Sequence, residues 1–251
     1  MKSPVVKRGL LFIISLPLFC NKITAQAPAV DSAFYQQAVS NTIIVYQQLI
    51  GDQARIFNGI QYSGYPFSFA KGHPYFDSDV FSNGTIVYDN VLYPNVQLLY
   101  DELSDAIIIH LSMHKVQLSS ERIAGFSLFD KKFIRITKDT ASSSPISKEG
   151  FYQLVYEGNV TVLKREVKTV LDELSSSEGI LRYIIPKQYY FIKKQNGYYP
   201  VYGKKEVLEI YSDRKKDVRE YIKNNGLSFK KGPESMLAVV SAYYDQLTKK
   251  D

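Results

Sequence analysis

Short segments that alternate apolar and polar residues, separated by turn-forming residues, most constrain how this chain can fold. The clearest example is "YYFIKKQNGYYPVY" at residues 189–202, where two such runs flank Asn196-Gly197. Asn-Gly favours the two-residue turn of a β-hairpin. A second hairpin is predicted around Glu157–Asn159, in "FYQLVYEGNVTVLKREV". Because a short turn joins antiparallel strands, the sequence predicts a mostly antiparallel sheet.

The stretch "GTIVYDNVLYPNVQLLYD", residues 84–101, repeats Tyr-Asp at 88–89 and 100–101. Asp89 and Asn90 both tolerate positive φ, which predicts a two-residue turn with Tyr88 opposite Val91. In the following strand, alternate residues include Leu98 and Tyr100. We interpret the tyrosines as half-buried sheet residues and the aspartates as strand-end acids. A ligand patch made of Tyr and Asp is the alternative.

Helical patterns lie at both ends of the chain. Apolar residues recur at near-helical spacing over residues 32–50, and again in "SDRKKDVREYIKNNG" and "PESMLAVVSAYYDQL". Gly226 follows the first C-terminal pattern, and Pro233 opens the second. The predicted fold class is α+β: a mostly antiparallel, strongly bent sheet or partial barrel, with an N-terminal helix and C-terminal helices packed on it.

The first 25 residues are predicted to be a secretory signal peptide. Basic residues precede an apolar run of about ten residues, whereas a membrane-spanning helix needs roughly twenty. Ala25 supplies the cleavage signal, so the mature chain is expected to begin at Gln26 without a transmembrane segment. Anchoring through a lipid on Cys20 is less favoured, because Phe19 stands where a lipoprotein signal has a small residue. We expect an exported protein, periplasmic or secreted.

Residues 26–251 are predicted to form a single α+β domain, with a possible sub-boundary at the polar stretch 139–150. The formal net charge is +6, and residues 1–25 contribute four positive charges, so the mature chain carries about +2. This small excess does not favour nucleic-acid binding. Residues 26–150 carry nine Lys/Arg against twelve Asp/Glu, and 151–251 carry eighteen against thirteen. We interpret the basic half as a solvated surface; a patch facing anionic lipid or polysaccharide is the alternative.

The residues that usually carry catalysis or hold metals are sparse. Cys20 is the single cysteine, so the mature chain has neither a disulfide nor a cysteine nucleophile. His110 and His114 have helical metal-pair spacing, but they lie in a predicted strand, where they would be about 13 Å apart. A calcium site formed by Asp77, Asp79 and Asn83 is an open alternative. The sequence lacks the common hydrolase, metalloprotease and nucleotide-binding motifs, and no metal or cofactor is expected.

The order of several motifs resembles an uncharacterised family of exported proteins from Bacteroidota. These motifs are "IFNG", "GHPYF", "GTIVYDN", "YPNVQLLYDELSDAIII" and "FYQLVYEG", and the resemblance covers most of the mature chain. Asp89-Asn90 stands where Asp-Gly is expected. The resemblance implies export and this architecture, and it carries over no activity and no catalytic residue.

The segment "GHPYFDSD" is the candidate partner-binding loop, because loops on a rigid sheet often carry binding groups. Its candidate residues are His73, Tyr75, Asp77 and Asp79. The competing interpretation is structural: Pro74 sets a turn while Tyr75 and Phe76 plug the end of the sheet.

These observations favour an exported non-catalytic cell-envelope protein that binds a partner or ligand. One alternative is a periplasmic carrier of an apolar or lipid ligand, with a cavity lined by residues such as Val87, Leu92 and Leu98. A second alternative is an enzyme of unrecognised type, which would bring polar groups with perturbed pKa values together in a cleft. The identity of the partner and the oligomeric state are left open.

Overall fold

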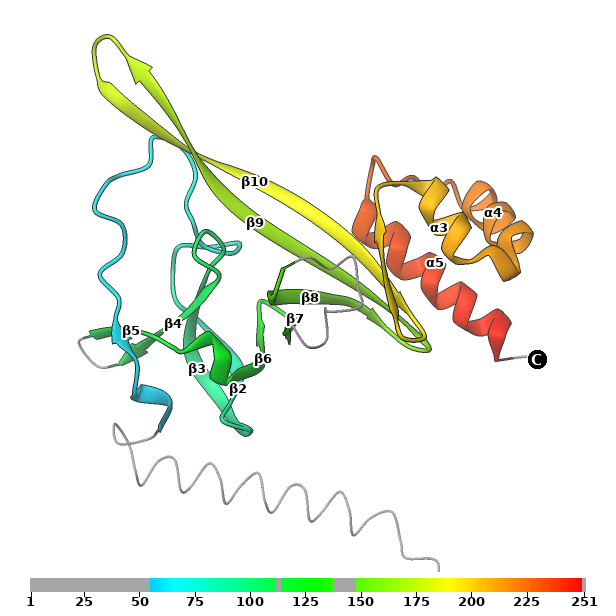
Figure 1. Cartoon of the computed structure of the whole chain (residues 1–251), viewed down its shortest axis with the longest axis horizontal. Coiled ribbons are helices and arrows are strands. Elements are labelled where there is room, and N and C mark those ends of the chain that lie inside the picture. Colours follow the sequence, from blue (N-terminus) through cyan, green and yellow to red (C-terminus); the bar gives the residue numbers. More distant parts are fainter. Residues whose placement is uncertain (1–54, 112–113, 138–147, 250–251) are drawn as a thin grey trace, which may run out of the picture. The chain divides into compact units, whose positions relative to one another are not determined.

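The computed structural model describes residues 55–111, 114–137 and 148–249 (Figure 1). These residues belong to a compact unit that spans Ile44–Asp251. The signal peptide predicted at 1–25 and the helix predicted at 32–50 lie outside the described residues.

The described strands form one open sheet in which all neighbouring strands are antiparallel, as the sequence predicted. Their order is β1-β5-β4-β3-β2-β6-β7-β8-β9-β10-β11, with β1 and β11 at the two edges. The strands are β1 (Ile60–Gln61), β2 (Ser82–Tyr88), β3 (Val91–Asp101), β4 (Ala106–Leu111), β5 (His114–Gln117), β6 (Ile123–Leu128), β7 (Lys131–Ile136), β8 (Gly150–Glu157), β9 (Val160–Ser175), β10 (Gly179–Lys194) and β11 (Gly197–Val201).

Helices follow the last strand, which confirms the C-terminal helical prediction. They are α3 (Lys204–Ile210), α4 (Lys215–Asn224) and α5 (Pro233–Thr248), with 3₁₀ turns at Arg55–Phe57, Ser120–Arg122 and Ser212–Arg214. Pro233 occupies the first turn of α5, and Gly226 beyond α4 has a positive φ of 60°. α5 packs on β8 and β9. Across the described ranges, each helix is too short or too polar to cross a bilayer.

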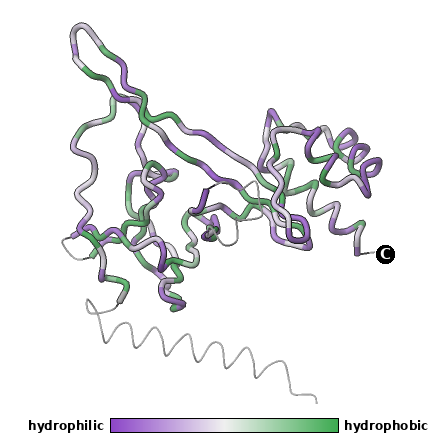
Figure 2. The backbone as a smooth tube through the Cα atoms, viewed as in Figure 1, coloured by the Kyte–Doolittle hydropathy of each residue, from purple (hydrophilic) through white to green (hydrophobic). Residues whose placement is uncertain are grey.

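Two main hydrophobic cores stabilise the described unit (Figure 2). The first contains Tyr88 and Tyr100, which are 0% and 2% exposed. The Tyr100 ring lies 5.2 Å from that of Phe126 and 5.4 Å from that of Phe133. These two tyrosines therefore pack within the sheet, as we interpreted, and are buried more deeply than expected. The second core lies between the β8–β11 end of the sheet and the helices.

The hairpin predicted at Asp89-Asn90 is confirmed in both turn and register. Tyr88 pairs with Val91, and the φ angles of Asp89 and Asn90 are 52° and 62°. Two successive positive φ values are the mark of the type I′ turn, whose twist matches that of the flanking strands. The Asp89 carboxylate also accepts from Arg122, next to β6.

Replacing Asn90 with alanine is expected to lower the free energy of unfolding by about 1 kcal/mol. The alanine Cβ disfavours the left-handed conformation, which asparagine tolerates. Asn90→Gly is the matched control and should stay within about 0.5 kcal/mol of the unchanged protein. Urea unfolding followed by circular dichroism measures both. Equal stability of the two variants would contradict a left-handed residue at this position.

β3 contains a β-bulge, which the alternation of apolar and polar residues in the sequence does not reveal. Val87 pairs with Leu92, whereas Gly84 pairs with Val96, so β3 holds one more residue than β2 between these pairs. Asn95 sits there with φ of 54°. An extra residue reverses the alternation of faces. Leu92 is consequently 46% exposed while Leu98 is fully buried.

Two other local predictions are corrected. The final hairpin turns at Gln195-Asn196 instead of Asn196-Gly197, because Lys194 pairs with Gly197 and Gln195 takes the positive φ. This register sets Val201 opposite Tyr190, within the second core.

His110 and His114 belong to neighbouring strands, β4 and β5, and not to one continuous strand. His110 pairs with Lys115, and His114 pairs with Leu111. Since adjacent positions in a strand point to opposite faces, the two imidazoles lie on opposite sides of the sheet.

Candidate functional site

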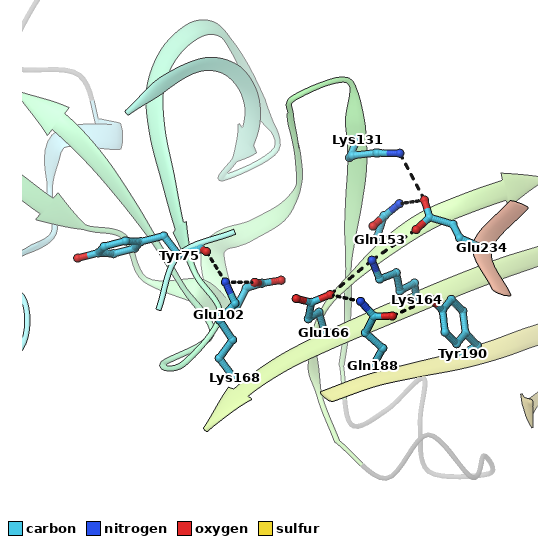
Figure 3. A network of polar contacts seen from close by, with 10 residues as sticks. All are labelled: Tyr75, Glu102, Lys131, Gln153, Lys164, Glu166, Lys168, Gln188, Tyr190 and Glu234. Atoms are coloured by element: carbon cyan, nitrogen blue, oxygen red, sulfur yellow. Dashed lines mark hydrogen bonds and ion pairs between the residues drawn. The ribbon is translucent and has the colours of Figure 1, made fainter. Parts of the chain in front are cut away.

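A polar groove runs along one face of β9 (Figure 3). Lys164, Glu166 and Lys168 alternate along the strand and therefore share this face. Two adjoining cavities of about 570 and 380 Å³ open onto it, one beside the start of α5 and one beside residues 73–77. Both cavities are lined by Lys131, Lys164, Gln188 and Glu234.

Glu234, in the first turn of α5, organises one end of the groove. Its carboxylate lies 3.4 Å from Lys164 Nζ and 3.3 Å from Lys131 Nζ. It also accepts a 2.8 Å hydrogen bond from Gln153 Nε2. The start of a helix favours a negative charge, because its first backbone N–H groups lack partners within the helix. Four elements, β7, β8, β9 and α5, therefore meet at this carboxylate.

Glu166 organises the middle of the groove. Lys164 Nζ lies 3.5 Å from its carboxylate, and Gln188 Nε2 donates a 2.7 Å hydrogen bond to it. The Tyr190 hydroxyl in turn donates to Gln188 Oε1 at 3.1 Å. The β9–β10 register explains this row, since Glu166 pairs with Gln188 and Lys164 with Tyr190.

Electrostatic interactions keep Lys164 and Glu234 in their charged forms. Burial alone would lower the pKa of Lys164, but the carboxylates of Glu234 and Glu166 outweigh it and raise that pKa. Burial alone would raise the pKa of Glu234, but Lys164, Gln153 and Lys131 together lower it. Both groups are therefore charged at neutral pH and are poor proton donors or acceptors there.

A buried ion pair fastens the candidate loop to the sheet. Lys168 Nζ lies 3.1 Å from Glu102 Oε2 and donates to the backbone carbonyl of Tyr75. The Glu102 side chain is only 2% exposed. Its burial raises its pKa, and Lys168 offsets this only partly, so the pKa of Glu102 reaches about 7. Glu102 does not line either cavity of the groove.

The residues of the predicted loop have different surroundings in the structure. His73 and Asp77 line the smaller cavity, whereas exposed Asp79 lines neither cavity. Tyr75 is half-buried, and its hydroxyl lies 3.2 Å from that of Tyr62. Phe76 packs against the first core, so part of the segment does plug the sheet. The segment thus combines structural residues with groove-lining ones, and Phe76 belongs to both groups.

A buried acid at the end of β3 holds the preceding loop. Asp101 is fully buried, and its Oδ2 accepts hydrogen bonds from the hydroxyls of Tyr62 and Tyr65. Its Oδ1 accepts from the backbone N–H groups of Leu103 and Ser104, at 2.9 and 3.1 Å. Burial and the hydrogen bonds to their neighbours raise the pKa of both tyrosines. Asp101 therefore stabilises the loop and is not accessible to a ligand.

The three residues proposed to line an apolar cavity do not come together. Leu98 lies in the first core, Leu92 is exposed, and Val87 is half-buried opposite Leu92. The bulge at Asn95 separates the faces on which Leu92 and Leu98 lie.

Sequence reasoning missed the groove, although one signal was present. In "VTVLKREVK", apolar residues at 160 and 162 give way on the same face to Lys164, Glu166 and Lys168. A polar run on a face that begins in the core indicates that the covering layer ends there. The contribution of Glu234 could not be inferred, because it lies 70 residues from Lys164.

No group of three or more His, Cys, Asp and Glu side chains suited to a metal occurs where the structure is described. Asn83, one of the three possible calcium ligands, accepts a 2.7 Å hydrogen bond from Gln97.

No family model, curated protein or solved structure matches this chain.

Proposed function

We propose that this chain is an exported, non-catalytic cell-envelope protein that binds a polar ligand or partner segment in the groove along β9. The observation that carries the proposal is the convergence of Lys131, Lys164, Glu166 and Glu234 on one cavity-lined face. Charges of both signs, with the amide of Gln188 between them, suit a ligand that bears both donors and acceptors. Export rests on the signal peptide predicted at residues 1–25 and on the resemblance to exported Bacteroidota proteins.

The pKa shifts of Lys164 and Glu234 favour a binding role over acid–base catalysis for these two groups. Lys164 and Glu234 line the groove but are held in their charged forms. Glu102 has a pKa of about 7, which suits proton transfer, but it is buried and does not line the groove. Glu102 is therefore outside the reach of a ligand bound in the groove.

The double substitution His73→Ala with Asp77→Ala is expected to reduce ligand retention at least about tenfold. It removes two groove-lining side chains, while stability should fall by only about 1–2 kcal/mol, because alanine disfavours the left-handed φ of 56° at Asp77 but neither side chain belongs to a hydrophobic core. Immobilised protein is exposed to a cell-envelope extract, and retained small molecules and proteins are quantified by mass spectrometry.

Asp79→Ala is the matched control, since Asp79 belongs to the same loop, is exposed and lines neither cavity. It should leave retention unchanged. Equal retention by all three proteins would refute the groove as the binding site. A loss with Asp79→Ala alone would place binding on the outer surface of the loop instead.

A further inference from the structure

Beyond Lys168, β9 and β10 continue as a two-stranded ribbon that ends in a turn at residues 175–179 (Figure 1). The register runs without a shift from Lys168–Pro186 to Ser175–Gly179. Each strand of a ribbon has an outer edge, where backbone N–H and C=O groups need partners other than the neighbouring strand. The two outer edges of this ribbon differ.

The outer edge of β10 is protected. Ala70 N–H donates to Arg182 O, and Ile184 N–H donates to Lys71 O, at 2.7 and 3.0 Å. Because outward backbone groups occur at every second residue, position 186 also points outward. Pro186 occupies it and has no N–H to offer. Segment 70–71 and Pro186 thus close this edge over residues 182–186.

The outer edge of β9 is open. Lys168 N–H donates away from β10, to Glu102 O at 3.2 Å. The same alternation directs the N–H and C=O groups of Val170, Asp172 and Leu174 outward. For these three residues, the described part of the chain shows strand pairing with β10 alone.

Side chains along this edge combine exposed apolar and acidic groups. Leu171 and Leu174 are 47% and 87% exposed. Asp172 and Glu173 lie between them, and Arg182 lies 3.6 Å from Asp172. Natural edge strands usually carry lysine, proline or a bulge that blocks further pairing. Residues 169–175 contain no lysine or proline, and their register shows no bulge.

We propose that residues 169–175 of β9 bind an extended segment of a partner protein, which adds a strand to the sheet. Side-chain complementarity defines the partner. Directly opposed residues interact across paired strands, so the segment presents basic residues to Asp172 and Glu173 and apolar residues to Leu171 and Leu174. This site is separate from the groove and does not depend on the function proposed for it.

A second copy of the chain that pairs about Asp172 fits this edge less well than a basic partner. Two-fold antiparallel pairing centred on Asp172 would place the two Asp172 carboxylates opposite each other. On the other face of the ribbon, each Glu173 would lie opposite Leu171 of the second copy. Like charges at opposed positions destabilise a strand pair.

The test uses the peptide acetyl-Thr-Val-Lys-Lys-Val-Val-Thr-amide, whose two lysines meet Asp172 and Glu173 in antiparallel register. Binding to the protein is measured by NMR, together with amide hydrogen exchange. The amides of Val170, Asp172 and Leu174 should exchange at least about tenfold more slowly with peptide bound, since each gains a hydrogen-bond acceptor. A peptide N-methylated at its pairing amides keeps the side chains and should not bind.

Asp172→Pro and Asp172→Ala form a matched pair. Both remove the carboxylate, but only proline removes the outward N–H, and an edge position tolerates proline. Asp172→Pro should bind the peptide at least about tenfold more weakly than Asp172→Ala. Circular dichroism reports whether each variant is folded.

Three results would overturn the proposal. Equal binding of the methylated peptide would show that backbone pairing is not involved. Slow exchange of the three amides in the free protein would mean that the chain itself covers the edge. A dimer that Asp172→Pro dissociates would identify a second copy as the occupant. Loss of peptide binding with groove retention intact, or the reverse, distinguishes the two proposed sites.

Discussion

Asp101→Ala is expected to lower the free energy of unfolding by about 4 kcal/mol. The substitution removes the acceptor of four hydrogen bonds, two from tyrosine hydroxyls and two from backbone N–H groups. Each buried donor left without a partner costs about 1–3 kcal/mol, and water can reach part of the vacated site. Because Asp101 is fully buried, local rearrangement cannot supply four replacement acceptors.

Asp101→Asn is the matched control and should cost about half as much. Its amide oxygen can still accept from Leu103 and Ser104, and the hydroxyls of Tyr62 and Tyr65 can turn to accept from the amide nitrogen. Urea unfolding followed by far-ultraviolet circular dichroism measures both variants, since the chain has no tryptophan to report by fluorescence. A cost below about 1 kcal/mol for Asp101→Ala would show that the loop at residues 62–75 is not held by this carboxylate.

Raising the pH from 5 to 8 is expected to lower stability by about 3 kcal/mol through Glu102. Its pKa is about 7 in the folded protein, against 4.5 for the free side chain. The folded state therefore binds this proton more tightly than the unfolded state does. The resulting stabilisation is complete below pH 4.5 and is lost as the pH rises to 7, at about 1.4 kcal/mol per pH unit.

Other charged groups also affect this pH dependence, each in a defined direction. Lys168 and Lys164 favour the charged form of Glu102, and Glu166 opposes it; all three effects are included in its pKa. The raised pKa of Asp105 acts in the same direction as that of Glu102. The lowered pKa values of Glu234 and Asp213 give stability that is lost only in more acidic solution.

Glu102→Gln should flatten most of the pH dependence between 5 and 8, because the amide does not titrate. Unfolding free energies at closely spaced pH values give the slope directly. Glu166→Gln is the control: it changes a neighbouring carboxylate and should leave a clear slope. A Glu102→Gln protein with an unchanged slope would assign the titration to another group.

Features set by residues that are adjacent in the sequence could be predicted. Asp89-Asn90 predicted both a turn and its register, since the left-handed preference of these residues is local. Pro233 and Gly226 correctly marked a helix start and a helix end. The bulge at Asn95 was missed, because one extra residue leaves the alternating pattern on each side of it intact.

Features that depend on tertiary packing could not be predicted. The final hairpin turns one residue earlier than the Asn-Gly dipeptide favours. This register places Val201 opposite Tyr190 in the second core. His73 and Asp77 were selected as loop residues, but their cavity is completed by Lys131 and Glu234, from other parts of the sequence. The groove exists because a strand face extends beyond the helix that covers it. The polar run at Lys164, Glu166 and Lys168 marks that strand face, but the contribution of Glu234 depends on how α5 packs.

The order of strands also determines what assembly of the sheet costs in chain entropy. From β6 to β11 each strand pairs with the next one in sequence, so every pairing brings together strands that are consecutive in the chain. Pairing β2 with β6 brings together residues about 40 apart, such as Thr85 and Ser127. Closing a longer loop loses more entropy before any contact compensates for it. The junction at β2 and β6 is therefore an entropically costly step in forming a sheet whose later strands can be added one hairpin at a time.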